Sequence, residues 1–334
     1  MIGMFLSEFL IWNVSGFTQV LSEGVVNAIS LILIGMLIYI LLFVIFTDII
    51  QRFKVNDFTG VLILGMIYGL LLEGIFATKV FEPGIGPCIT GLCFSSVVFT
   101  ALSWHPLIDF LVGFLILGLL FNGKLNLGNK KINSKEILIV ILLSCFWFMW
   151  AYSQWNILKM PSGIAPIAQV LVLIFPILVF MILTPLALKG RLIEGNIIGG
   201  KFYFLSLVIL LIFSFMRFKS LPNKISFLFF ILIFLFYSGL FLLYMKTHSK
   251  DKSRQSIYEK CFPIKENFSL IKYLKIIGIV LLVYVLFRLF AKAFSLVPIF
   301  TLISKIFFAM FLMFALAFPI WVLGRIFYNF MKNY

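Results

Sequence analysis

Three ionisable residues stand in apolar stretches where charge is unexpected, and their types suit acid–base chemistry. Glu73 lies in one stretch, and His105 and Asp109 lie in the next one along the chain. Placing a charge in the middle of a bilayer is costly, so such residues usually face the interior of a helix bundle and serve a function. We therefore take Glu73, His105 and Asp109 as the candidate catalytic set.

The three residues are predicted to lie at one depth and to face each other. Glu73 falls near the end of a predicted helix over 59–80, and His105 falls in a predicted helix over 95–121. One loop joins these helices, and at 1.5 Å per residue both side chains lie roughly 10–15 Å below the same surface. Asp109 follows His105 at the fourth position and so shares its helix face.

Four roles are open to this set. It could be a general acid–base group in which a carboxylate fixes the imidazole tautomer. It could bind a divalent metal ion, with one His and two carboxylates suiting iron or manganese better than zinc. It could be a proton relay in a transporter, or a buried polar network that only fixes helix packing. A site with several histidines is excluded, because the chain has two and His248 lies in a predicted loop.

Pro106 adds a backbone irregularity beside His105. Because proline has no N–H and its ring clashes with the preceding turn, the helix either kinks there or begins there. In the second case Ser103 caps the new helix and 95–103 forms a re-entrant piece, which is tolerated only against protein or a water-filled cavity. Three glycines would let neighbouring helices approach closely: Gly69, Gly74 and Gly113.

Other side chains are candidates for binding a substrate near this set. Trp150 and Tyr152 belong to an aromatic cluster that fits either an interfacial belt or a vestibule above the site. Lys305 lies deep in the last apolar stretch, where it could pair with a site carboxylate or reach the headgroups. Trp104 directly precedes His105.

Cys88 and Cys93 share one short loop between the two site-bearing helices. This loop is predicted to face an oxidising exterior, where two nearby thiols can form a disulfide. A disulfide would shape the turn above the site, and two free thiols are the alternative.

The composition predicts an all-α integral membrane protein. The 334 residues are 63% hydrophobic and 12% charged, and the mean hydropathy is +1.17. A soluble domain has roughly 25% charged residues. The formal net charge of +15 is explained by basic loops that orient the helices, so no nucleic-acid partner is expected.

Continuous apolar runs of bilayer-spanning length predict about nine transmembrane helices. Because most of the Lys and Arg residues fall at alternate ends of these runs, the N-terminus is placed outside and the C-terminus inside. Residues 1–23 are predicted to form an interfacial or half-inserted helix, with a full span as the alternative. Residues 24–334 form a single bundle with site-bearing helices over 59–121. The predicted spans are 24–50, 59–80, 95–121, 136–157, 165–188, 201–217, 225–245, 273–291 and 295–324, the last six forming hairpins over 136–188, 201–245 and 273–324.

The segment 246–272 is predicted to be a cytoplasmic loop. Its basic beginning suits contact with anionic lipid headgroups, and a plain solvated connector is the alternative. The bias toward Phe, Ile, Lys and Asn is typical of an AT-rich prokaryotic genome, so the plasma membrane of a prokaryote is the expected location.

These features favour a membrane-embedded enzyme, a hydrolase or transferase that acts on a lipid-like substrate near the outer leaflet. The alternatives are a secondary transporter with a proton or ion relay, and a structural or assembly subunit without catalysis. A divalent metal ion is the only cofactor that the residues indicate. The deciding observation is whether Glu73 and His105 come within hydrogen-bonding distance.

Overall fold

A computed structural model describes the chain over 25–81, 87–89, 91–112, 200–218, 224–248, 270–294 and 297–332, with a few residues between 134 and 145 and at 256–257. The predictions for 1–23 and 165–188 lie outside these residues, and those for 136–157 and 246–272 lie largely outside them.

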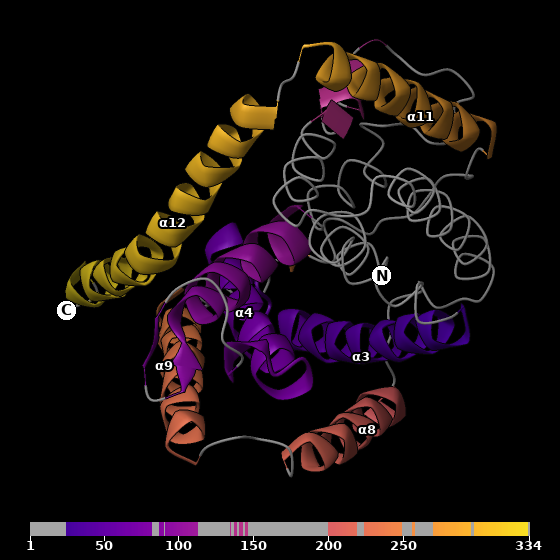
Figure 1. Ribbon diagram of the computed structural model, residues 1–334. Helices are drawn as coiled ribbons and strands as arrows, with labels where there is room; N and C mark the ends of the chain where they lie inside the picture. The colour runs from indigo at the N-terminus through magenta and orange to yellow at the C-terminus, as the bar shows by residue number, and fades with distance from the viewer. Residues whose placement is uncertain are drawn as a thin grey trace.

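The described residues are almost entirely helical (Figure 1). Each predicted helix that falls within them has a counterpart, so the helical class and the approximate helix positions were readable from apolar runs. The elements are α3 (Val25–Arg52), α4 (Phe58–Leu71), the π-helix η2 (Leu72–Phe76), the 3-10 helix η3 (Lys79–Phe81), β1 (Cys88–Ile89), β2 (Leu92–Cys93), the π-helix η4 (Ser96–Val112), α8 (Gly200–Phe218), α9 (Lys224–His248), α11 (Leu270–Ala293) and α12 (Val297–Lys332).

The last helix runs further than predicted. A glycine followed by arginine is a common helix end, which is why the boundary was placed at Gly324. In the structure α12 continues through Gly324 to Lys332, and a Cβ at Gly324 would meet nothing within 4 Å. The extra turns are held in place because the Arg325 guanidinium donates a hydrogen bond to the Thr59 hydroxyl at 3.0 Å.

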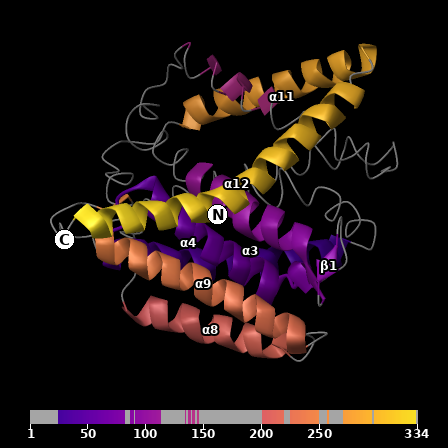
Figure 2. The same cartoon turned by 90° about the vertical axis from the view of Figure 1, so that its left-hand side faces the viewer.

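The helix formed by α4 and η2 is the centre of the bundle. In the most apolar stretch of this helix 83% of the residues are buried, whereas in the most apolar stretch of α9 28% are buried. A helix that is apolar on all sides belongs inside a bundle. Tyr68 of α4 is fully buried and packs edge-on against Tyr39 and Phe46 of α3. Figure 2 shows α4 between neighbouring helices, with β1 and the C-terminus at opposite ends of the molecule.

Two glycines of α4 allow unusually close contact with η4. A Cβ on Gly65 would lie 2.6 Å from the Cα of Pro106, and a Cβ on Gly69 would lie 2.1 Å from the carbonyl oxygen of Ala101. Gly65 and Gly69 are four residues apart and therefore line one face of the helix, the Gly-x-x-x-Gly arrangement of closely packed membrane helices. This contact brings η2 and η4, and with them the candidate residues, together.

The outer helices present apolar surfaces to their surroundings. Large exposed side chains such as Phe215, Leu235 and Ile320 lie on α8, α9 and α12. Within the described residues, three helices are long and apolar enough to cross a membrane: Phe58–Phe76, Ile225–His248 and Pro298–Lys332. The nine-span count and the orientation stay predictions.

A polar cluster joins α4, α9 and α12 at the end of the bundle away from β1. Asp57 caps α4 by accepting a hydrogen bond from the Gly60 N–H at 2.8 Å, and it accepts another from the Tyr244 hydroxyl at 2.6 Å. The Tyr244 ring stacks on His248 at 4.0 Å between centroids, and Arg325 lies over the Tyr244 ring. Helix ends that were predicted to share one side of the membrane thus lie together.

We expect Tyr244→Phe to destabilise this end of the bundle. The variant removes the hydroxyl that donates to Asp57, and a hydrogen bond to a charged group contributes about 1.5–3 kcal/mol. Thermal unfolding in detergent should show a lower midpoint, whereas Tyr328→Phe, at an exposed position of α12, should leave it unchanged. Equal midpoints for the two variants would contradict the assignment.

Candidate functional site

Glu73 is held in a short π-helix that follows α4 directly. The segment η2 covers Leu72–Phe76, and such wide turns are uncommon and often occur at functional sites. Gly74 makes room on the other side of this turn, because a Cβ there would lie 2.1 Å from the ring of Phe230 in α9. The local sequence therefore places Glu73 on the side of the turn that faces η4.

His105 and Asp109 lie on η4, which passes through Pro106 without a break. The π-helix covers Ser96–Val112 with Pro106 inside it, so the re-entrant alternative is wrong. Ser103 does not cap a new helix, because its hydroxyl lies 2.8 Å from the Val98 carbonyl oxygen, five residues earlier. The same hydroxyl also lies 2.6 Å from the Phe311 carbonyl oxygen of α12. Pro106 is accommodated because Gly65 of α4, which lies against it, has no Cβ.

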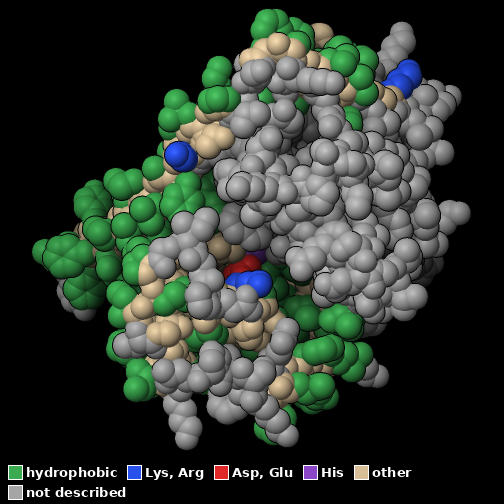
Figure 3. Space-filling view, viewed as in Figure 1, with side chains coloured by type: hydrophobic (Ala, Val, Ile, Leu, Met, Phe, Trp, Pro, Cys, Tyr) green, Lys and Arg blue, Asp and Glu red, His purple; other side chains and the backbone are tan. Residues whose placement is uncertain are grey.

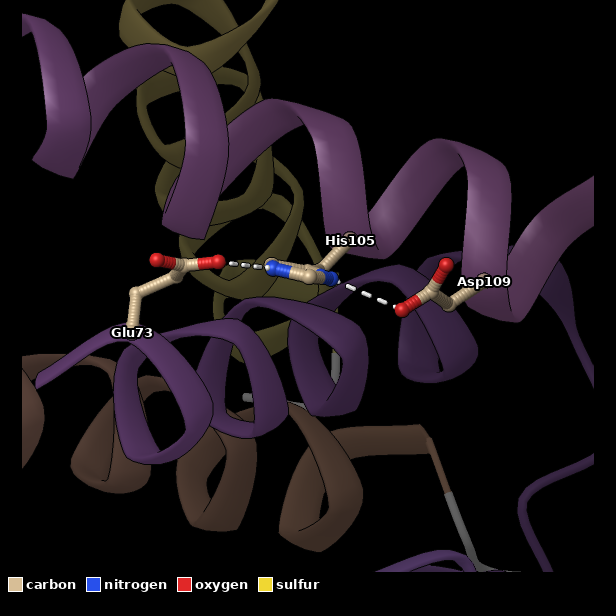
Figure 4. A network of polar contacts seen from close by, with 3 residues as sticks. All are labelled: Glu73, His105 and Asp109. Atoms are coloured by element: carbon tan, nitrogen blue, oxygen red, sulfur yellow. Dashed lines mark hydrogen bonds and ion pairs between the residues drawn. The ribbon is translucent and has the colours of Figure 1, made fainter. Parts of the chain in front are cut away.

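The three candidate residues form one hydrogen-bonded chain (Figure 4). The imidazole Nδ1 of His105 lies 2.7 Å from Asp109 Oδ2, and Nε2 lies 2.8 Å from Glu73 Oε1. His105 is 0% exposed, Asp109 1% and Glu73 4%. Matched depth and the spacing of four residues thus predicted the contact correctly, and the expected hydrogen bond between Glu73 and His105 is present.

The chain of hydrogen bonds holds an exchangeable proton. Each of the two contacts needs one proton between nitrogen and oxygen, whereas a neutral imidazole carries a single N–H. The trio therefore contains either an imidazolium between two carboxylates or a neutral imidazole with one protonated carboxyl. In both states a proton lies between His105 Nε2 and Glu73 Oε1 and can transfer along this contact.

The second carboxyl oxygen of Glu73 has no hydrogen-bond partner among the described residues. Leaving a buried acceptor unsatisfied costs about 1–3 kcal/mol, and more for a charged group. The space-filling view shows hydrophobic side chains over most of the described surface, with a small group of acidic and basic side-chain atoms near the centre of this face (Figure 3). Glu73 Oε2 is therefore a buried acceptor that still lacks a hydrogen-bond donor among the described residues.

The arrangement does not favour a metal ion. The two carboxylates lie at opposite edges of the imidazole ring (Figure 4), and each occupies one ring nitrogen. One ion would need ligand atoms that converge on it. Among the described residues, no group of three or more His, Cys, Asp or Glu could hold a metal ion.

Comparison with known proteins places the chain in a family. A family model described as "Uncharacterized membrane protein family" matches residues 2–327. The chain belongs to this family. It is therefore a membrane protein, in agreement with its composition and its apolar outer helices. No curated protein and no solved structure matches it.

Backbone strain lies close to the site of this membrane protein. Thr78, which follows η2, has a φ of 58°, a left-handed conformation that β-branched residues rarely adopt. Its hydroxyl donates a hydrogen bond to the Ala77 carbonyl oxygen at 2.7 Å. A residue held this way costs of order 1–3 kcal/mol, and such residues cluster at functional sites.

Two of the four predicted substrate-binding residues, Trp104 and Lys305, lie within the described residues. Trp104 of η4 is buried between Phe99 of the same helix and Phe311 of α12, so its ring packs η4 against α12. Lys305 is exposed on α12, apart from the buried carboxylates, and its reach to the headgroups remains a prediction. Trp150 and Tyr152 lie outside the described residues, as does Gly113.

A disulfide joins Cys88 to Cys93. These residues are directly paired in the two-stranded sheet β1–β2. The sheet lies at the start of η4, so the disulfide holds the turn that leads into the site-bearing helix.

Sequence reasoning missed two residues that build the site. Gly65 completes the glycine pair that admits Pro106, and its spacing from Gly69 was a readable signal. Tyr68 packs edge-on against the His105 ring at 5.7 Å between centroids. It lies one helical turn before Glu73 in an apolar run, which carries no signal that separates a site tyrosine from a core one.

Proposed function

We propose that this membrane protein is a membrane-embedded enzyme in which Glu73, His105 and Asp109 perform general acid–base catalysis on a lipid-like substrate. The proposal takes it to be a multi-pass protein of the plasma membrane of a prokaryote, with the site reached from the outer side. The observation that carries the proposal is a fully buried imidazole between two carboxylates, one of which keeps an oxygen without a hydrogen-bond partner among the described residues.

Each member of the trio has a distinct part in this proposal. Asp109 fixes the tautomer and orientation of the imidazole through Nδ1, as carboxylates commonly do for catalytic histidines. Glu73 takes a proton from an attacking water or hydroxyl and later returns it to the leaving oxygen. His105, bonded to Glu73 through Nε2, adjusts the basicity of that carboxylate by sharing its proton. The reaction class is hydrolysis or group transfer, and the protons balance within the trio.

A purely structural network accounts for the site less well. Networks that only fix helix packing stabilise when every member is satisfied. Here an acidic oxygen is buried without a partner among the described residues, next to a strained threonine and within a π-helix. Each of these three features lowers the stability of the fold, and helix packing alone requires none of them.

Proton-coupled transport is the second candidate. It is favoured by the linear order of Glu73, His105 and Asp109, in which Asp109 lies about one turn further along η4 than His105. Such chains relay protons in membrane transporters. An enzyme needs only the Glu73 end of this row of hydrogen bonds to be accessible, whereas a transporter needs both ends open to water.

The experiment that tests the enzyme is a comparison of lipid products. The full chain is reconstituted in vesicles of total lipid from its source cells, and the lipids are analysed by mass spectrometry before and after incubation. We expect a product with the wild type and none with Glu73→Gln, because the amide cannot accept the proton. General acid–base groups typically contribute about 10²–10⁴-fold to rate.

The matched control is Asp48→Asn, which removes a buried carboxylate on α3 that pairs with Arg52. It should leave the product unchanged. Equal product from wild type and Glu73→Gln would overturn the enzyme. Proton uptake into vesicles that Glu73→Gln and Asp109→Asn both abolish, without any lipid product, would favour transport instead.

A further inference from the structure

An apolar groove of about 470 Å³ lies between the β1–β2 sheet, the first half of η4 and the first half of α9. Binding pockets for small molecules typically have about 300–1,000 Å³, so the groove is large enough to hold one. Among the described residues that line it, all side chains are apolar except that of Tyr237. Lining residues include Ile89 and Leu92 of the sheet, Val98 and Leu102 of η4, and Leu232 of α9.

The shape of the groove suits a chain-like ligand. Its α9 wall is a single stripe at Phe229, Leu232, Ile233 and Phe236, which is the spacing of one helix face. At 1.5 Å per residue this stripe is about 10 Å long. A wall of this kind offers dispersion contacts along its length and very few polar groups, which matches a hydrocarbon tail rather than a polar metabolite.

The groove lies on an exposed apolar surface of a candidate membrane span. Its α9 wall belongs to the candidate membrane span Ile225–His248, and Leu232 is 54% exposed. The groove therefore opens on the surface that faces the acyl chains of a bilayer. It lies at the end of the bundle that carries β1 (Figure 2).

The groove and the Glu73 site are built on neighbouring parts of the same elements. Phe230, next to the groove residue Phe229, is fully buried and its ring fills the space beside Gly74. Gly74 directly follows Glu73 in η2. On the opposite wall, Leu102 precedes His105 by three residues on η4. A lipid tail in the groove would thus lie against η4, which carries His105 and Asp109, and against α9, which packs on η2 through Phe230.

We propose that this groove holds an acyl chain of the lipid on which the Glu73 site acts, so that the substrate is a lipid with a long unbranched tail. The identification of the bound lipid as the substrate rests on the proposed function. The occupancy of the groove by an acyl chain is a separate matter and can be tested without activity.

The test is photocrosslinking in a bilayer. The full chain is placed in nanodiscs of phosphatidylcholine and phosphatidylglycerol that contain phosphatidylcholine with a diazirine at the end of one acyl chain. After irradiation, labelled peptides are mapped by mass spectrometry. We expect labelling at 97–102 and 229–237 to exceed that on the exposed face of α12.

A pair of substitutions on one helix provides the control. Leu232→Trp fills the groove and should reduce its labelling to the level of α12. Leu235→Trp, on the same helix at 57% exposure and outside the groove, should leave it unchanged. Ile89→Trp, on the exposed rim, blocks the groove from another element and should act like Leu232→Trp.

The outcomes separate the two proposals. Uniform labelling, labelling insensitive to Leu232→Trp and Ile89→Trp, or crosslinks between two copies of the chain through the groove would each overturn the acyl-chain site. Glu73→Gln should keep wild-type labelling while it loses product. Groove labelling with a fully active Glu73→Gln would instead mean that the acyl-chain site stands and the proposed chemistry fails.

Discussion

Replacing Gly69 by alanine is expected to destabilise the bundle strongly. The new Cβ would lie 2.1 Å from the carbonyl oxygen of Ala101 and 2.9 Å from its carbonyl carbon. Both atoms are backbone, so no side-chain rotation can relieve the clash, and α4 and η4 must separate. Overpacking of a well-packed core typically costs 1–3 kcal/mol and occasionally more, and we expect about 3 kcal/mol or more here.

The matched control for Gly69→Ala is Gly239→Ala. A Cβ on Gly239 in α9 would meet nothing within 4 Å, and alanine is favoured over glycine in a helix interior by about 1 kcal/mol. Gly239→Ala should therefore be neutral or stabilising, whereas Gly69→Ala should give less monodisperse protein in fluorescence-detected size-exclusion chromatography and a lower unfolding midpoint. A normal elution profile and unfolding midpoint for Gly69→Ala would contradict the close contact of α4 with η4.

The contact between α4 and η4 also explains which parts of the site were predictable. Apolar runs and the depth of Glu73 and His105 were enough to place the two side chains together, because one short loop fixes the register of the two helices. The spacing of His105 and Asp109 placed both on one face, and this holds in a π-helix because its turn is only slightly wider than that of an α-helix. The regular spacing of residues along each helix was thus enough to predict which side chains of the site share a face.

Other features depend on contacts between distant segments and could not be predicted from a single sequence. The Tyr244 hydroxyl meets Asp57 across 187 residues, and the continuation of α12 depends on Arg325 reaching Thr59. The π-helical path through Pro106 depends on the glycine face of α4. Apolar sequence gives helix positions well, but it does not distinguish which polar residue at a helix end finds a partner on another helix.

The second large effect is expected from His105→Ala. This variant removes the partner of both Glu73 and Asp109 and leaves two buried carboxyl groups without the imidazole. Breaking a buried ion pair by removing one partner typically costs 3–5 kcal/mol. Since a folded domain is stable by about 5–15 kcal/mol, the unfolding midpoint should fall more for His105→Ala than for Tyr244→Phe.

A double-mutant cycle tests whether this loss arises from the trio. In the His105→Ala background, Glu73→Gln removes the charge that the first change left unpaired. We therefore expect Glu73→Gln to cost less there than in the wild type, or to stabilise. Residues in direct contact show coupling energies of about 0.5–3 kcal/mol. The measurement is thermal or denaturant unfolding of the wild type, both single variants and the double variant in one detergent.

The control cycle pairs His105→Ala with Asp48→Asn, whose carboxylate lies on α3 outside the hydrogen-bonded chain. These two changes should add, because uncoupled sites are additive within about 0.3–0.5 kcal/mol. Additive losses for His105→Ala with Glu73→Gln would mean that the imidazole and the carboxylate do not interact, and the acid–base assignment would fall with them. Strong coupling together with an unchanged lipid product would keep the network but reduce it to a structural role.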